Sequence, residues 1–462
     1  ICDDQRRTVA SPETGENAHA EPLVPPLTQG RRAPTPFERI WRNAAAHGFG
    51  IGCTVLVQLV TFPVLLAVWS QEMVGAWILI MTVPAYLALS DLGFASAATA
   101  KMTAAFAHED RNRLAQIFQS LLVLVLLLAA CLTGASTLLI LVVATFFTGT
   151  APWLAEFVPP LLLMVAYSGL QMLTRVPVAA MRASNQYGTA TVAADTMWTI
   201  EGLGVITIAA LGGALAECAF GYAAFRLGCL IALVVLQKAR LPWLKYNMSF
   251  FSWSEVRDLM RPTLAGAALP VSVVLAVQGM TLVAGGVLGA AAVAVLVPIR
   301  TATRFPVQAL AIFSRGSMPE VSRAHAMKTT EDLLRIVRTN ALIALGILAP
   351  TLVAFAFWGQ WLVSAWTLGR IEPDHNLVVL LAAAAFLHAV WFYSANYLLA
   401  TNAHIHLAKW TVGIVILTVL TSIVTTEQWG LVGLAATAAA GEAIIASIAV
   451  HHLLSALSRH QQ

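Results

Sequence analysis

Charged residues are scarce in this sequence of 462 residues. Asp, Glu, Lys and Arg make up only 11% of it, against roughly 25% in soluble globular domains. Hydrophobic residues make up 58%, and the mean hydropathy is +0.77. A soluble fold is therefore excluded. The net charge is only +4, and no basic stripe interleaved with aromatic residues is present, so nucleic acid is not an expected partner.

Cysteine and recognisable cofactor motifs are also rare. The cysteines are odd in number and lack Cys-x-x-Cys spacing, which argues against a disulfide framework and a metal site; they are Cys2, Cys53, Cys131, Cys218 and Cys229. No Lys-Ser/Thr pair follows the glycines at 48, 50 and 52, so they form no phosphate loop. No nucleotide motif is present and the predicted outer connections are short. We expect neither catalytic residues nor a bound cofactor, and no enzymatic activity.

Long apolar runs fill most of the chain. Twelve segments are long enough to cross a hydrocarbon core of about 30 Å as helices. Continuous rather than alternating apolarity favours helices over barrel strands, because lipid cannot satisfy open backbone groups. The sequence thus predicts an all-α polytopic membrane protein. The expected spans are 43–68, 73–96, 116–146, 152–180, 187–211, 214–237, 262–284, 288–313, 337–366, 376–399, 406–425 and 430–455.

The spans divide into two sets of six. We expect a proline-rich, disordered cytoplasmic tail at 1–38, a six-helix bundle at 39–238, an interfacial linker at 239–261 and a second six-helix bundle at 262–462. Lys and Arg gather in the even-numbered connections and the termini, whereas Arg370 alone falls on the other side. By the positive-inside rule, both termini are predicted to be cytoplasmic.

Ionisable side chains at membrane depth are expensive and usually mark a pathway. Arg300 and Arg304 are four residues apart, hence on one helix face, and Gln308 follows one turn later. Arginine forks suit phosphate oxygens, so this face could hold a pyrophosphate. The alternative is that both arginines are structural ties to acids such as Glu201 or Glu442.

A second polar face combines Asp195, Trp198 and Glu201 on the fifth span. Its carboxyl groups could bind protons or sodium and couple these ions to transport, or they could simply pair with Arg226. Arg226 is in turn an anion ligand or a countercharge. Asp91, in Ser-Asp-Leu-Gly, is predicted to form a turn at the cytoplasmic end of the second span and to contribute to gating there.

Several segments resemble polysaccharide-export flippases, the O-antigen and repeat-unit translocases of the multidrug/oligosaccharidyl-lipid/polysaccharide exporter superfamily. The similar segments are Gly-Ala-Trp to Ser-Asp-Leu-Gly at 75–93, Gln-Gly at 278–279 with the glycine at 289, Pro-Ile-Arg-Thr-Ala-Thr-Arg at 298–304, and Ser-Met-Pro-Glu-Val-Ser-Arg at 317–323. The likeness covers about 37–455. It implies the V-shaped fold of multidrug and toxic compound extrusion (MATE) transporters, in which two six-helix bundles surround a central cavity.

The resemblance also implies a function. Such flippases move an undecaprenyl-pyrophosphate-linked oligosaccharide across the bacterial inner membrane by alternating access and hold its headgroup with cationic residues. Arg300 and Arg304 match by position, Arg226 only by depth. Asp195, Glu201 and Glu442 are carried over weakly as ion-coupling residues. Expected partners are membrane lipids, the lipid-linked glycan, and polymerase and glycosyltransferase machinery. The rival reading is a proton- or sodium-coupled multidrug or cation antiporter of the same superfamily.

Overall fold

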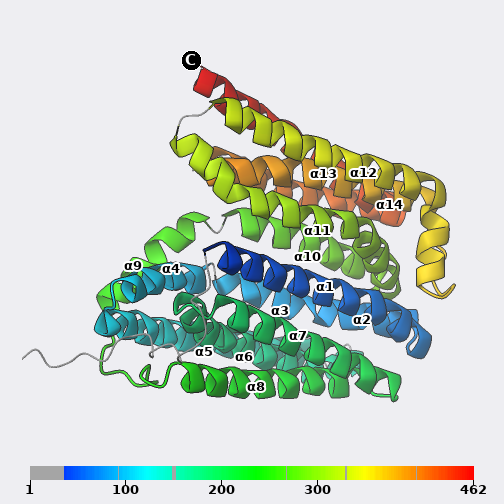
Figure 1. The fold of residues 1–462 in the computed structure, drawn as a ribbon. Helices are drawn as coiled ribbons and strands as arrows, with labels where there is room; N and C mark the ends of the chain where they lie inside the picture. The colour runs from blue at the N-terminus through cyan, green and yellow to red at the C-terminus, as the bar shows by residue number, and fades with distance from the viewer. Residues whose placement is uncertain are drawn as a thin grey trace, which may run out of the picture.

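The computed structural model describes residues 36–91, 93–147, 152–266, 268–327, 330–401 and 403–461, and these residues form helices and short connections without any strand (Figure 1). The predicted all-α class is confirmed. The proline-rich tail expected at 1–38 falls outside the described residues except for its last three, because the first helix begins at Pro36.

The helices fall into two lobes in chain order, shown one above the other in Figure 1. The N-lobe consists of α1 (Pro36–Val68), α2 (Gln71–Ile80), α3 (Thr82–Leu87), η1 (Ala88–Asp91), α4 (Phe94–Ala107), α5 (Arg111–Phe147), η2 (Pro152–Phe157), α6 (Val158–Ala183), α7 (Tyr187–Ala210) and α8 (Leu215–Arg240). After α9 (Trp253–Gly266), the C-lobe consists of α10 (Ala268–Leu288), α11 (Ala290–Ala326), α12 (Thr330–Trp366), α13 (His375–Ala400) and α14 (Ile405–Gln461).

Ten described helices are long and apolar enough to cross a membrane, which makes this a multi-pass membrane protein. One of them, α14, supplies two crossings because the chain reverses at Gly430, whose φ of 60° and ψ of −147° suit glycine alone. The hydroxyls of Thr425 and Thr437 lie 2.7 Å apart across this reversal. The shorter apolar stretch Gln71–Leu87 occupies the place of the second predicted span but is shorter than these ten helices.

The second span is not the single helix that hydrophobicity predicts over 73–96. It breaks into α2, α3 and η1 before α4 begins. Pro84 has no backbone N–H to donate, which weakens the ladder just after the break at Met81. Gly93 then adopts a φ of 94°, a left-handed conformation that ends the span.

The two lobes share one hydrophobic core at one end and have separate cores at the other. The shared core lies toward the α1–α2 and α12–α13 connections and includes Leu65 and Trp77 from the N-lobe and Leu296, Val363 and Leu377 from the C-lobe. At the opposite end, one cluster holds only residues of the N-lobe, the α8–α9 connection and α9, and another only residues of the C-lobe. The lobes are therefore joined at one end and packed independently at the other.

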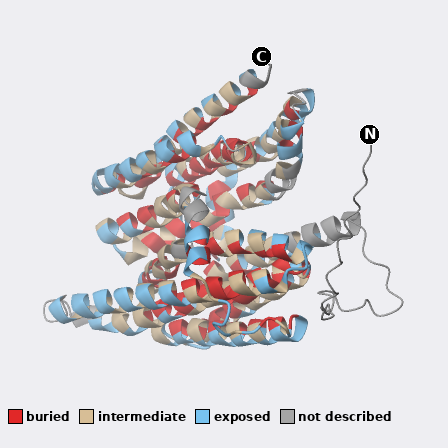
Figure 2. Ribbon diagram, turned by 90° about the vertical axis from the view of Figure 1, so that its left-hand side faces the viewer, coloured by how far each residue is buried: buried red, intermediate tan, exposed pale blue. Residues whose placement is uncertain are grey.

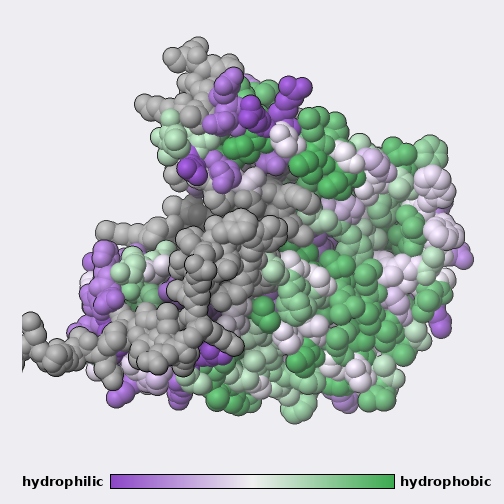
Figure 3. Space-filling model, viewed as in Figure 1, coloured by the Kyte–Doolittle hydropathy of each residue, from purple (hydrophilic) through white to green (hydrophobic). Residues whose placement is uncertain are grey.

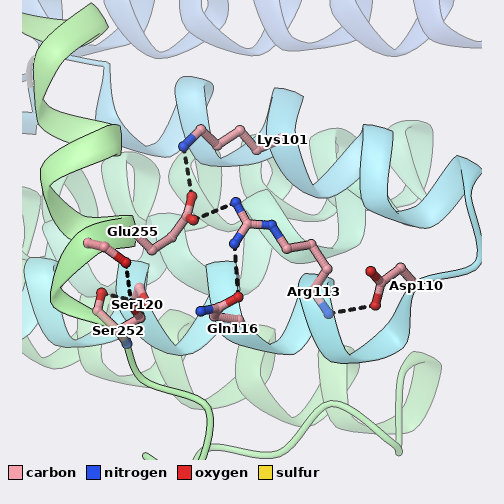
Figure 4. A network of polar contacts seen from close by, with 8 residues as sticks. Lys101, Asp110, Arg113, Gln116, Ser120, Ser252 and Glu255 are labelled. Carbon is pink, nitrogen blue, oxygen red and sulfur yellow. Dashed lines mark hydrogen bonds and ion pairs between the residues drawn. The ribbon is translucent and has the colours of Figure 1, made fainter.

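The segment between the lobes is anchored to the N-lobe. Glu255, at the start of α9 and only 2% exposed, forms ion pairs with Lys101 of α4 at 2.7 Å and with Arg113 of α5 at 2.6 Å (Figure 4). The backbone N–H of Ser252 donates to the hydroxyl of Ser120 on α5. The predicted linker at 239–261 thus packs against α4 and α5, and the chain passes to the C-lobe between α9 and α10.

The surface is consistent with burial in a bilayer. Hydrophobic side chains cover the right-central and lower parts of the face in Figure 3, and hydrophilic ones gather toward its edges, including the left edge, where Figure 1 places α4 and α9. Figure 2 shows that exposed residues follow the outer helices. Many of these residues are large and apolar, such as Leu138, Phe220, Val235 and Phe357, as expected for side chains that face lipid tails.

The seam between α2 and α11 requires a glycine. A Cβ added at Gly75 would overlap the backbone carbonyl of Ala290, and backbone cannot move aside as a flexible side chain can. We expect Gly75→Val to open this end of the molecule. Ile371 lies in the shared core and is only 1% exposed. In a background without native cysteines, a cysteine introduced by Ile371→Cys should react several-fold faster with a membrane-impermeant maleimide when Gly75→Val is also present. Gly134→Val, where an added Cβ meets nothing within 4 Å, is the control; equal labelling of both variants would contradict this role of the seam.

Candidate functional site

A cavity between the lobes contains both arginines predicted from the sequence. It encloses about 830 Å³ of empty space including its open mouth, and its polar lining comes from α1, α11 and α13: Gln58, Arg300, Thr301, Arg304, Gln308 and His388. An adjoining pocket shares both arginines and His388 and extends between the C-lobe helices to Glu442. The sequence-predicted face of Arg300, Arg304 and Gln308 therefore lines one continuous site.

Arg300 is held in place by uncharged partners. It is half-buried, and its Nη1 donates to the carbonyl of Val277 at 2.8 Å while its Nη2 donates to the hydroxyl of Thr281 at 3.0 Å, both on α10. Neither partner neutralises the guanidinium. The predicted alternative of a structural tie to an acid does not describe Arg300 within the part of the chain that the structure describes.

Arg304, one turn further along α11, has no hydrogen bond or ion pair to any described residue. It is half-buried and lines both cavities. The negative charge of the Glu442 carboxylate attracts the Arg304 guanidinium, but the two groups are not within ion-pair distance. A guanidinium has five N–H donors, and Arg304 therefore presents unused donors to the cavity.

Glu442 is engaged by two residues of α13. Its Oε1 lies 3.0 Å from Nδ1 of His388, and its Oε2 accepts from Nε1 of Trp391 at 2.5 Å. The His388 ring is fixed further by Phe392, which stacks on it at 6.1 Å, and by Trp391, which meets it edge-on at 4.9 Å. Glu442 thus brings one negative charge to the wall that holds the two arginines, and each of its oxygens already contacts one donor on α13.

Gln308 connects the site to the other lobe. Its side-chain amide donates to the side-chain oxygen of Gln58 on α1 at 3.0 Å. Nearby, the indole of Trp366 on α12 donates to the carbonyl of Leu59 at 2.9 Å. Both hydrogen bonds join the lobes, and the one between Gln308 and Gln58 lies in the wall of the cavity.

The structure separates Glu201 and Arg226 from this cavity and pairs them inside the N-lobe. Arg226 Nη2 lies 2.8 Å from Glu201 Oε1, and Tyr167 donates to the same oxygen at 2.8 Å. Glu201 is fully buried and Arg226 is 7% exposed. Tyr222 packs edge-on against Tyr167 at 5.4 Å. Of the alternatives left open by the sequence, simple pairing of Glu201 with Arg226 matches this geometry.

The remaining sequence-predicted residues also lie away from the arginine cavity. Asp195 lies against α1, because a Cβ added at Gly50 would overlap its carboxylate. Trp198 is half-buried on α7 and lines neither of the two cavities around Arg304. Asp91 ends η1, but its side chain falls outside the described part of the structure, so its predicted turn and gating role stays a prediction.

Sequence reasoning missed His388 and Gln58. Each is a single polar side chain inside an apolar run, so no spacing pattern distinguishes it from an isolated core residue. The usable signal was depth: His388 lies near the centre of the span predicted at 376–399, where polar groups are costly and need a partner. His388 and Glu442 come from different helices, and only the fold shows that they meet.

Solved structures with this fold are MATE family transporters of the MOP superfamily. An inward-facing multidrug resistance MATE transporter is 13% identical, covers 87% of this chain and 95% of its own, and superposes with a TM-score of 0.73. An outward-facing conformation of such a transporter is 14% identical, the match covers 92% of this chain and 97% of that one, and the TM-score is 0.61. The chain therefore has the MATE transporter fold. It superposes better on the inward-facing structure.

A third structure of this fold differs in its pocket. A MOP superfamily transporter from Pyrococcus furiosus is 13% identical, covers 92% of this chain and 97% of its own, and gives a TM-score of 0.64. It is described as having a binding pocket of reverse polarity that suggests a different function. The sequence matches no protein-family profile and no curated protein.

The geometry of Glu201 and Arg226 predicts a structural role. Either Glu201→Leu or Arg226→Leu leaves a buried charge without its partner, which costs about 3–5 kcal/mol, whereas replacing both members of a buried pair is often nearly neutral. We expect each single variant to melt well below the native protein in detergent and the double variant to recover most of the loss. Arg335→Leu, an exposed position on α12, should leave the melting temperature unchanged. A double variant as unstable as either single one would contradict this role.

Proposed function

We propose that this protein is a flippase that moves a polyprenyl-pyrophosphate-linked oligosaccharide across the bacterial inner membrane for polysaccharide export. The observation that carries the proposal is Arg304, whose guanidinium faces the cavity without a hydrogen-bonding partner among the described residues. Arg300 adds a second positive charge one turn away, anchored only by a carbonyl and a hydroxyl. Such a site favours a ligand with adjacent anionic oxygens.

The mechanism follows from where these groups lie. Arg300 and Arg304 bind the pyrophosphate, the glycan occupies the remaining cavity between the lobes, and the polyprenyl chain stays in lipid. The lobes then rock about their shared core, which alternately opens each end. The arginines hold the pyrophosphate by non-covalent contacts throughout, so the cycle makes and breaks no covalent bond.

The conformation supports loading from the inner side. The cores are separate at the end that holds α4, α9 and the α11–α12 connection, where the basic connections place the cytoplasm. The opposite end is closed by the shared core. In this state a headgroup would enter from the cytoplasmic leaflet, and both termini would be cytoplasmic. Glycosyltransferases that build the glycan and a polymerase that extends it are the partners this direction implies.

The competing proposal is a proton- or sodium-coupled antiporter for drugs or other cations. One observation favours it: Glu442 places a carboxylate in the cavity wall, and a solved structure of this fold is a multidrug transporter. The charges oppose it, since Glu442 is already bonded to His388 and Trp391 while two arginines line the same space. A cationic substrate would face net repulsion there.

Transport should depend on Arg304. Removing a charge-assisted hydrogen bond costs about 1.5–3 kcal/mol, so Arg304→Ala should weaken headgroup binding about 10- to 150-fold. Arg304→Lys keeps the charge but loses the fork and should give an intermediate loss. The measurement is transbilayer movement of a fluorescent polyprenyl-pyrophosphate oligosaccharide in proteoliposomes at a concentration below saturation.

Arg240→Ala is the matched control, because Arg240 is exposed at the end of α8 and does not line either cavity around Arg304. It should flip the lipid at the native rate. A well-folded native protein that moves no lipid but exchanges a cationic dye for protons would overturn the flippase in favour of the antiporter.

A further inference from the structure

His388 is a titratable group that the transport mechanism above does not use, although it lines both cavities around Arg304. Because an ionised carboxylate only accepts hydrogen bonds, the contact with Glu442 places a proton on Nδ1 of His388. The other ring nitrogen, Nε2, has no hydrogen bond to any described residue. In the neutral ring, Nε2 is therefore an unprotonated acceptor available for a second proton.

We propose that His388, oriented by Glu442, is a proton-binding site that controls the anion affinity of Arg300 and Arg304. This inference rests on the proposed function, since it assumes that the two arginines bind an anionic headgroup. Protonation of Nε2 adds one positive charge to the wall of the cavity. Anion binding then favours the protonated ring, and protonation favours the bound anion, because linkage between two sites is reciprocal.

The charged groups around His388 make this coupling specific. From α14, Glu442 stabilises the imidazolium through the contact at Nδ1. From α11, Arg300 and Arg304 oppose it. On its own helix, the nearest titratable side chain is Tyr393, which donates to the carbonyl of Val337 on α12. The described α10 residues lining the pocket are uncharged, and α12 packs near Ala385 and Ala389 through aliphatic side chains.

An anion in the cavity removes the opposition. With the site empty, the two arginines repel a proton at Nε2. A bound pyrophosphate neutralises them, while Glu442 continues to attract the proton. The ring is unable to respond by swinging away, because Phe392 and Trp391 hold it on two sides and only 9% of its side chain is exposed. Proton uptake should therefore accompany headgroup binding.

The test measures binding of inorganic pyrophosphate to the purified full-length protein in lipid nanodiscs by calorimetry. The titration is run from pH 8 to pH 5.5 in buffers of different ionisation enthalpy, so that the heat reports the protons taken up. His388→Gln keeps an amide donor for Glu442 but cannot become charged. Pyrophosphate itself titrates in this range, and the His388→Gln protein reports that contribution. His375→Gln, exposed at the start of α13, is the matched control.

We expect the native and His375→Gln proteins to gain roughly tenfold more affinity on acidification than His388→Gln does, the size expected for one unit charge acting across the cavity. Compared with His388→Gln, these two proteins should also bind as much as one additional proton per pyrophosphate bound. Glu442→Gln removes the negative charge that attracts the imidazolium. The midpoint of the pH dependence of pyrophosphate binding should therefore fall in this variant, while its affinity for pyrophosphate at pH 8 should rise. This second variant keeps the test decisive if His388→Gln does not fold.

Three results are possible besides the expected one. If native and His388→Gln proteins bind pyrophosphate with the same pH dependence, the proton site is overturned and the flippase proposal survives. An unchanged midpoint in Glu442→Gln overturns the role of Glu442 and with it the proposal. If the native protein binds no pyrophosphate at any pH, the proposed function itself fails, and this inference fails with it.

Discussion

A charge inside a membrane protein must be either neutralised by a partner or reached by water or a ligand, and the two lobes meet this requirement in different ways. The N-lobe neutralises Arg226 completely, with Glu201 at 2.8 Å and Tyr167 bonded to both. The C-lobe places Arg300 and Arg304 against a single carboxylate that is already bonded to His388 and Trp391. Since an uncompensated buried charge costs several kcal/mol, the C-lobe arrangement is stable only where water or an anion can reach the arginines. The open cavity supplies that access, and the location of the site follows from the shortage of acids around it.

The second constraint is the way the lobes are joined. One hydrophobic core extends through both at the α1–α2 end, whereas each lobe packs separately at the other end. The ion pairs of Glu255 with Lys101 and Arg113 attach α9 to the N-lobe. The lobes are therefore separately packed at this end and meet across the seam that holds the Gln308–Gln58 hydrogen bond. This division would allow the proposed rocking motion to leave the separate core of each lobe intact.

Much of the fold could be predicted from the sequence, because apolar length and the positions of turn residues specify spans directly. The α14 reversal was recognisable in this way, as was the common face of Arg300 and Arg304, since residues four apart on a helix must neighbour each other. The break in the second span was missed because hydrophobicity does not register the lost N–H of Pro84. The partner of Arg226 could not be chosen, since pairing with the Asp195 and Glu201 face and a free role as an anion ligand were both compatible with the sequence. Pairing depends on which helices pack together, and periodicity within one helix carries no such information.

The helix α11 contributes residues to the shared core, to the cavity and to the seam between the lobes. Its first turns, including Val293 and Leu296, belong to the shared core, and the next turns present Arg300, Arg304 and Gln308 to the cavity. Gln308 bonds across to Gln58 of the N-lobe. Pro298 and Pro306 each remove one backbone hydrogen bond from α11 between Ala290 and Gln308, so this helix is not a rigid rod. In the proposed cycle, an anion bound at Arg304 would act first on the adjacent turn, which holds the bond between Gln308 and Gln58. The cavity residues and the seam contact of Ala290 with Gly75 therefore lie on the same helix, in segments separated by proline.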